Sequence, residues 1–197
     1  VNNMTIEQLV GEMFNVGFGI INSGWGELVQ IETETGLPYA QFTRDDPQRS
    51  MLDYLANYKF ANFTIHSDIG KTRNNLLQAT KTLKEFSISN VGVEPFITIN
   101  STGGFIMDAT TSLPTNIALS NAKVSTIQTV NELYAKELRA LGVNSVINSY
   151  ICNNEDINSS LNTYGSDITK AMAVSTIASD GLKTNGEIKF FPGVNTC

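Results

Sequence analysis

Several residue types that support common enzyme and binding chemistries are scarce in this sequence. The 197 residues include one histidine, one tryptophan and two cysteines, and charged residues make up only 16% of the composition. The 13 lysines and arginines form no cluster that could follow a phosphate backbone, which argues against nucleic acid as a partner. Two isolated cysteines and a single histidine likewise argue against zinc. We therefore expect neither a metal nor a cofactor.

Long apolar runs are also missing. No segment approaches the roughly 18 apolar residues needed to cross a bilayer, so no membrane span is expected. The N-terminus lacks the charged-then-apolar order of a signal peptide, so secretion would require Val1 to be a mature terminus made by processing. The scarcity of charge and the abundance of Asn, Ser and Thr are common in secreted glycoproteins. We expect a secreted, extracellular location.

The hydrophobic pattern predicts helices and strands in alternation along the chain. A capping box formed by Thr5 and Gln8 opens a short helix. One apolar face of this helix consists of Ile6, Leu9, Val10 and Met13. Strands are expected at 14–20, 61–65, 95–99, 145–151 and 187–191. Further helices are expected at 47–58, 71–86, 124–141 and 167–182, and Gly142 is expected to cap the third of these.

This alternation indicates βαβ units, and therefore a parallel sheet buried on both faces. The predicted class is α/β, with about five parallel strands alternating with helices in one domain over 1–197. The stretch at about 22–43, rich in Gly and Thr, is expected to be an inserted loop or small hairpin.

Two kinds of covalent modification are expected. Four N-x-S/T sequons predict N-glycosylation if the source is eukaryotic, although chance also produces such triplets in a sequence this rich in Asn, Ser and Thr. The two cysteines follow the fourth and fifth predicted strands, and neighbouring strands lie about 4.8 Å apart, so a disulfide is favoured over unpaired or intermolecular thiols. The sequon asparagines are Asn3, Asn62, Asn100 and Asn158, and the cysteines are Cys152 and Cys197.

Four segments together resemble the N-terminal domain of family 3 glycoside hydrolases. They are 4–13 (MTIEQLVGEM), 102–104 (TGG) with 112–114 (SLP), 137–143 (ELRALGV) and 189–193 (KFFPG). Their order and spacing on the alternating pattern make the combination more specific than any one of them. The resemblance implies a (β/α)8 or related barrel, present here as its first part, from a family that acts on β-linked sugars including N-acetylglucosamine.

The same resemblance implies that the sugar-handling chemistry has been lost. The family's sugar contacts lie at strand carboxyl ends, as is usual for barrels. Its D-x-E-G-G resembles 100–104 (NSTGG), A-P-V-x-D resembles 147–151 (INSYI), N-R-x-F-G resembles 161–165 (LNTYG), and K-H-F-P-G-H-G resembles 189–195 (KFFPGVN). The glycines are retained, whereas acids, an arginine and both histidines are replaced. Asn100, Thr102 and Lys189 then remain as a vestigial pocket, although Lys189 could equally be paired structurally.

Catalysis by the family mechanism is not expected. The family's nucleophilic aspartate lies on the seventh strand, beyond the five strands predicted here. Retaining hydrolysis needs two acid/base-capable groups about 5 Å apart across the bond. This chain supplies neither the nucleophile nor the histidine-bearing loop that assists in some members.

Four other residues have both a functional and a structural interpretation. His66 would end the second strand, but a lone histidine without a placed acid or nucleophile is usually a polar strand-end residue. Asp68 and Glu155 could form a carboxylate pair, although acids after strands commonly cap the next helix. Trp25 could stack on a sugar ring or anchor the loop between its glycine neighbours. We favour the structural interpretation in each case.

The leading functional hypothesis is a non-catalytic secreted scaffold or self-assembling structural subunit. A sheet cut from a barrel exposes strand edges, so we expect a homo-oligomer or a second chain that completes the barrel. One alternative is a carbohydrate-binding pseudoenzyme that uses the remnant pocket around Asn100 and Lys189. The other is a β-glycosidase that is active only with a complementing chain.

Overall fold

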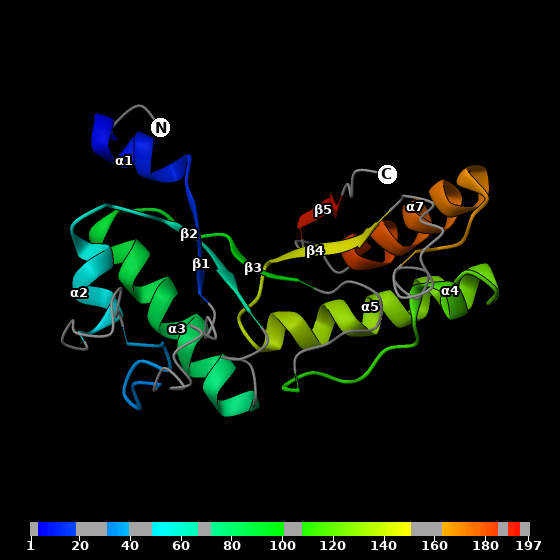
Figure 1. Cartoon of the computed structure of the whole chain (residues 1–197), viewed down its shortest axis with the longest axis horizontal. Coiled ribbons are helices and arrows are strands. Elements are labelled where there is room, and N and C mark those ends of the chain that lie inside the picture. The colour runs from blue at the N-terminus through cyan, green and yellow to red at the C-terminus, as the bar shows by residue number, and fades with distance from the viewer. Residues whose placement is uncertain are drawn as a thin grey trace, which may run out of the picture. The chain divides into compact units, whose positions relative to one another are not determined.

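Helices and strands alternate throughout the described part of the chain (Figure 1). The computed structural model describes residues 4–18, 31–39, 49–66, 72–100, 108–150, 163–184 and 189–193. The chain divides into two units, Val1–Thr98 and Ile99–Cys197. The strand order in the sheet is that of the chain, β1-β2-β3-β4-β5. The predicted α/β class, a parallel sheet with alternating helices, is confirmed.

The first unit packs helices against parallel strands. Its elements are α1 (Ile6–Glu12), β1 (Asn15–Phe18), α2 (Met51–Ala56), β2 (Asn62–Ile65), α3 (Arg73–Asn90) and the start of β3 (Ile97–Asn100). β1 and β2 are parallel, with Asn15 opposite Asn62 and Phe18 opposite Ile65. Phe63 and Ile65, which alternate along β2, are fully buried, as are Leu76 and Leu83 of α3. This alternation is why one face of β2 faces the core.

Local hydrogen bonds set the beginning of α1. The Thr5 backbone N–H donates to Gln8 Oε1 at 2.7 Å, and the Gln8 backbone N–H donates to Thr5 Oγ1 at 3.3 Å. This reciprocal pair is the predicted capping box, which satisfies two otherwise unpaired donors of the first turn. The prediction of a short helix from this tetrapeptide is confirmed.

A tight turn at residues 31–38 packs against α3 in the same unit. Ile31 and Pro38 form an antiparallel bridge, and the Glu32 backbone N–H donates to Leu37 O at 2.8 Å. Glu32 Oε2 also accepts a hydrogen bond from Thr35 Oγ1 at 2.7 Å. Leu37 is fully buried. The described part of the predicted insert at 22–43 is therefore a turn with its own hydrogen bonds and a buried anchor.

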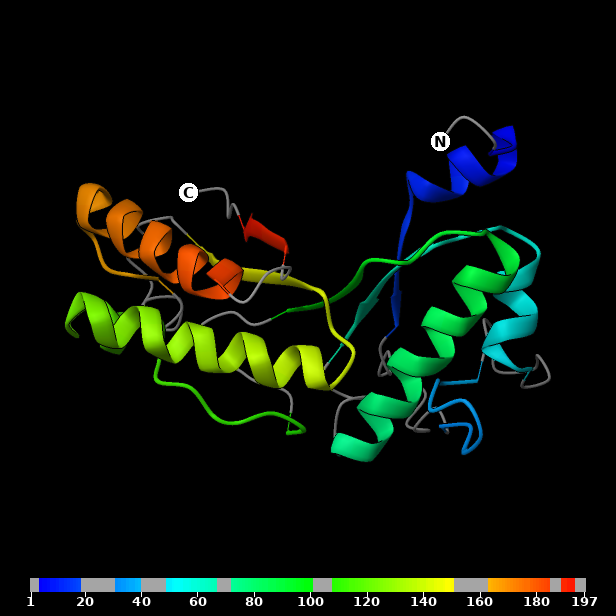
Figure 2. The ribbon, with the colours of Figure 1, turned by 180° about the vertical axis from the view of Figure 1, so that it is seen from behind.

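The second unit is dominated by two long helices beside a strand pair. Its elements after β3 are α4 (Asn116–Leu119), α5 (Val124–Ala140), β4 (Ser145–Tyr150), α7 (Ile168–Thr184) and β5 (Lys189–Gly193). α5 and α7 lie side by side in both views (Figures 1 and 2). β4 and β5 are parallel, from Ser145 opposite Lys189 to Tyr150 opposite Gly193. None of the helices in the described residues has the length and apolar composition needed to cross a bilayer.

The start of α2 and the end of α3 differ from the predicted helix boundaries, and at both places a backbone conformation sets the boundary. Among the described residues, the predicted helix 47–58 covers Met51–Ala56, and its N-cap Ser50 has a non-helical ψ of 134°. α3 continues past the predicted 86 to Asn90, and Gly92, at φ 84°, follows its end. α5 ends as predicted, with Gly142 at φ 81° and its N–H bonded to Arg139 O. The short helix α4 was not predicted.

Candidate functional site

The carboxyl ends of the strands are where a barrel of this class would place its chemistry. In the first unit, β1 ends at Phe18, and His66 directly follows the end of β2. β3 ends at Asn100, and in the second unit β4 ends at Tyr150 and β5 at Gly193. These described positions carry no carboxylate. The described residues also contain no group of three His, Cys, Asp or Glu side chains that could hold a metal ion.

His66 lies across the neighbouring strand in the first unit. Its Nε2 is 3.3 Å from the position that a Cβ on Gly17 would take, so the ring rests on the bare backbone of β1. Beside it, Thr64 Oγ1 donates to Asn15 Oδ1 at 2.9 Å across the same strand pair. His66 itself is exposed. Its described surroundings are a glycine and neutral polar groups, which suits the polar strand-end interpretation.

Asn62, one of the sequon asparagines, is held inside the first unit. Its side-chain Nδ2 donates to Glu12 O at 2.8 Å, and its Oδ1 accepts from the Phe96 backbone N–H at 3.2 Å. The residue is 8% exposed. The nitrogen and the oxygen of the Asn62 side-chain amide are therefore both hydrogen-bonded, one to the end of α1 and the other to the segment before β3. Glycosylation of Asn62 stays a prediction.

Glu12 is the described acid with a raised pKa. Burial raises the pKa of its carboxyl, and a hydrogen bond from Asn62 acts in the opposite direction. Its Oε1 is buried without a hydrogen-bond partner in the described protein. Glu12 ends α1 and lies near Asn62, the first residue of β2. It is therefore at the amino end of that strand, away from the edge where a barrel enzyme performs its chemistry.

We expect Glu12→Gln to stabilise the protein slightly at neutral pH. Because the folded-state pKa is raised, the ionised carboxylate is disfavoured in the fold, and stability falls as pH rises through the glutamate range above about 4.3. The variant removes this ionisation, so it should gain less than about 1 kcal/mol near neutrality. Below the ordinary glutamate pKa the two proteins should match. Urea unfolding across this pH range checks the result, and a pH-independent difference would contradict it.

A carboxylate in the second unit connects two segments of the family resemblance. Glu137 of α5 accepts a hydrogen bond from the Thr111 backbone N–H at 3.0 Å and from Thr111 Oγ1 at 3.0 Å. Thr111 directly precedes the Ser-Leu-Pro sequence at 112–114, and Glu137 begins the 137–143 motif. Leu138 is fully buried in that motif. Glu137 and Leu138 of the 137–143 motif therefore have structural roles, and Glu137 connects this motif to the residue before Ser112.

A core cluster of the second unit contains a residue from another family motif. Tyr164 is 1% exposed and stands where the family's N-R-x-F-G has its aromatic residue. Tyr164 was not predicted as a core residue. The available signal was an aromatic residue at the motif's aromatic position, two residues after the position of the family's arginine. The other buried members of the cluster are Ile127, Ala171, Val174 and Ala178.

Two of the three residues of the proposed vestigial pocket, Asn100 and Lys189, lie within the described residues. Asn100 is the last residue of β3, whereas Lys189 is the first residue of β5 and lies opposite Ser145, the first residue of β4. Their role in binding stays a prediction. Thr102, Asn3, Asn158, Cys152, Cys197, Trp25, Asp68 and Glu155 lie outside the described residues.

Comparison with known proteins identifies the fold. No protein-family model matches the sequence, and no curated protein matches it. A β-N-acetylhexosaminidase from Beutenbergia cavernae matches with a TM-score of 0.71 and 15% identity, over 95% of this chain and 53% of that one. A glycoside hydrolase family 3 β-N-acetylglucosaminidase from Paenibacillus sp. matches with a TM-score of 0.69 and 16% identity, over 92% of this chain and 31% of that one.

An exo-1,3/1,4-β-glucanase from a Pseudoalteromonas species gives the same result, with a TM-score of 0.65 and 14% identity, over 91% of this chain and 27% of that one. At such identities the likeness establishes the fold alone. This chain therefore has the fold of part of a family 3 glycoside hydrolase and spans about half of the first of these proteins, and less of the other two.

Proposed function

We propose that this chain is a non-catalytic secreted scaffold, a structural subunit that reuses a glycoside hydrolase fold within an assembly. The chemistry of the described strand ends carries the proposal. Retaining hydrolysis needs two carboxyl groups about 5 Å apart. The described residues that end the strands, or directly follow them, are Phe18, His66, Asn100, Tyr150 and Gly193.

Of the described acids between the carboxyl end of a strand and the next described helix, Asp108 and Asp167 lie in the second unit, and neither suits hydrolysis. The Asp167 side chain accepts a hydrogen bond from the Lys170 backbone N–H at 3.1 Å, so it caps the beginning of α7. Asp108 is exposed in a turn. The other described acids lie on helices, in the 31–38 turn or before β3. A helix cap and a solvated turn residue support a structural role.

The chain should show no turnover of aryl β-glycosides, including β-N-acetylglucosaminides and β-glucosides. Release of the aryl alcohol in the presence of the purified protein should equal the buffer rate, because no described acid pair is placed to protonate and attack a glycosidic bond. A family 3 β-N-acetylglucosaminidase assayed in parallel serves as the positive control. Turnover that co-purifies with the chain would overturn the proposal.

The assembly part of the proposal follows from the sheet. Within the described strands the order begins with β1 and ends with β5, which leaves one edge of each available for pairing. We expect the protein to elute from size-exclusion chromatography well above the 21.5 kDa of one chain, and electron microscopy to show oligomers or fibres. A stable monomer at high protein concentration would contradict this expectation.

A further inference from the structure

Two tyrosine rings lie in contact where α2 ends. Tyr54 is in the last turn of α2, and Tyr58 follows it by four residues. Their ring centroids are 5.0 Å apart, with 50° between the ring planes. Residues four apart are neighbours on a helical surface, so this spacing brings the two phenols together. Two phenols in contact can react with each other, which a single tyrosine cannot do.

The backbone after α2 holds Tyr58 in this position. The Tyr58 N–H donates to Leu55 O at 3.0 Å, so the helical turn continues past Ala56, the last residue of α2. Lys59 then has a φ of 54°, which ends the turn before the chain enters β2. A positive φ is uncommon for a residue other than glycine. The turn that brings the two tyrosines together is therefore a specific feature of the fold.

Phe60 fixes the plane of the Tyr58 ring. The two rings are stacked, with centroids 5.4 Å apart and 14° between their planes. Phe14 in turn meets Phe60 edge-on, with centroids 5.9 Å apart. Stacked and edge-on arrangements are the favoured geometries of aromatic pairs. These contacts give the Tyr58 ring a defined orientation beside Tyr54.

The pair is accessible to solvent, and its inner phenol is neutral. Tyr58 is 50% exposed, and Tyr54 is half-buried. Burial raises the pKa of the Tyr54 phenol, and the charge of Tyr58 and a side-chain hydrogen bond between the two residues raise it further. Since an ordinary tyrosine has a pKa of about 10, Tyr54 keeps its proton at neutral pH. An oxidant in solution therefore meets Tyr58 with a second, neutral phenol in contact with it.

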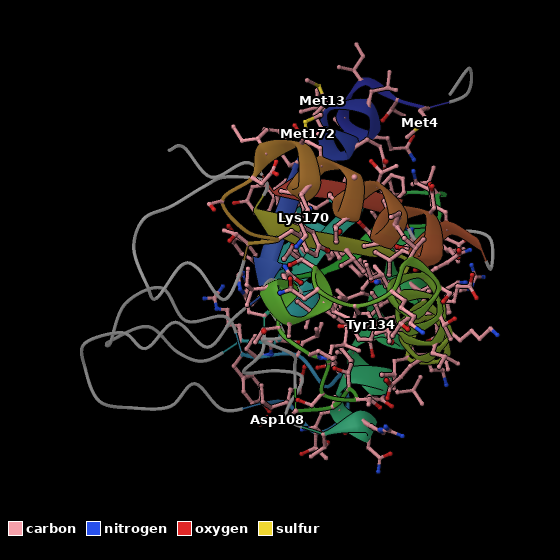
Figure 3. The ribbon with its side chains drawn as sticks, turned by 90° about the vertical axis from the view of Figure 1, so that its right-hand side faces the viewer. Met4, Met13, Asp108, Tyr134, Lys170 and Met172 are labelled. Atoms are coloured by element: carbon pink, nitrogen blue, oxygen red, sulfur yellow. The ribbon has the colours of Figure 1, made fainter. Side chains whose placement is uncertain are left out.

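Other described tyrosines provide a comparison. Figure 3 labels Tyr134, which comes from α5 and is 2% exposed. Tyr164 is 1% exposed, and Tyr39, directly after the 31–38 turn, is half-buried. An oxidant that must touch a ring therefore reaches Tyr58 more readily than Tyr134 or Tyr164. Tyr39 is the suitable control, because its exposure is of the same class as that of Tyr54.

We propose that Tyr54 and Tyr58 form an oxidative cross-linking site, at which a haem peroxidase with hydrogen peroxide joins the two rings as dityrosine. Each phenol loses one electron and one proton to give a tyrosyl radical. The radicals form a carbon–carbon bond between ring carbons ortho to the oxygens. The hydrogens on those carbons leave as protons, and both oxygens regain a proton. One hydrogen peroxide takes up the two electrons and two protons and becomes two waters.

Contact between the rings favours coupling within the pair. A group held beside its partner has an effective concentration of roughly millimolar or more. Radicals on separate molecules, at micromolar protein, meet about a thousandfold less often. The expected product is therefore one modified chain and not a covalent dimer. This site goes beyond the proposed function, because the coupling requires neither an assembly nor a sugar.

The test treats the purified protein with a haem peroxidase and an equimolar amount of hydrogen peroxide. Trypsin cleaves after Arg49 and Lys59, so residues 50–59 form one peptide that contains both tyrosines. Coupling should make this peptide lighter by two hydrogen atoms and give it dityrosine fluorescence. Oxidation of Met51 to its sulfoxide would instead add one oxygen, so mass spectrometry separates the two reactions.

Conservative variants identify the partners of the coupling. Tyr54→Phe and Tyr58→Phe should each lower the yield of dityrosine at least about tenfold, whereas Tyr39→Phe should leave it unchanged. Both pair variants keep the ring contacts, and circular dichroism verifies that they fold. Covalent dimers on a denaturing gel without the lighter peptide would overturn the proposal. So would an unchanged 50–59 peptide after all the peroxide is consumed, or an equal loss of yield in Tyr39→Phe.

Discussion

Replacing Tyr164 with alanine should destabilise the protein by about 3–5 kcal/mol, because it empties the middle of a packed cluster. Tyr164 is 1% exposed and packs with Ile127 of α5 and with Ala171, Val174 and Ala178 of α7. For a chain of this size the loss corresponds to a fall of roughly 6–20 °C in the unfolding midpoint. Thermal unfolding followed by near-ultraviolet circular dichroism measures it.

Met172→Ala is the matched control for this prediction. Met172 is also a large apolar residue and lies in α7, but it is 56% exposed. Its truncation should change stability by no more than about 0.5 kcal/mol. Tyr164→Phe, which keeps the ring in the cluster, should retain most of the stability. Tyr164→Ala with a stability close to wild type would show that this motif residue is not retained for packing.

The stability of the Tyr164 variants tests why the motif at 161–165 matches the family at some positions and not at others. At 161–165 the aromatic and glycine positions are retained, while Asn162 stands where the family has its arginine. The retained Tyr164 is in the core, and the retained Glu137 accepts hydrogen bonds from Thr111. Two residues that match the family motifs therefore have packing or hydrogen-bonding roles in this structure. These structural roles agree with the proposed scaffold.

The sequence predicted those elements whose signals are local. The capping box at Thr5 and Gln8, the apolar strands and the glycine after α5 each act within a few residues, and the structure confirms all three. Helix ends set by backbone conformation were less predictable. The non-helical ψ of Ser50 and the positive φ of Gly92 leave little trace in hydrophobic periodicity.

Contacts between distant segments could not be predicted from the sequence. Asn62 has the sequence of a glycosylation site, but its amide joins Glu12 and Phe96, which are 50 and 34 residues away. The buried Oε1 of Glu12 is likewise a result of packing. Of the candidate site, the sequence predicted approximately where the described strands end. It could not show that the apolar stripe of α1 remains exposed, because periodicity defines a face without saying what covers it.

Gly36→Ala should destabilise the first unit by about 2–5 kcal/mol, through two separate effects. Gly36 has a φ of 70°, a conformation that disfavours any side chain by about 1–2 kcal/mol. The added Cβ would also lie 2.8 Å from Ala79 N and 3.0 Å from Asn75 O, both backbone atoms of α3. A helix backbone cannot move aside as a flexible side chain can, so the turn must lift away.

Gly92→Ala separates these two effects. Gly92 has a similar φ of 84°, but a Cβ there would meet nothing within 4 Å. It should therefore show only the conformational cost, about 1–2 kcal/mol. Gly36→Ala should exceed it and also speed hydrogen exchange at the Leu37 amide. The turn that holds Leu37 is anchored to α3 by the hydrogen bond from Gln78 Nε2 to Glu34 O. Equal losses in the two variants, measured by urea unfolding, would mean that the 31–38 turn does not pack against α3 in solution.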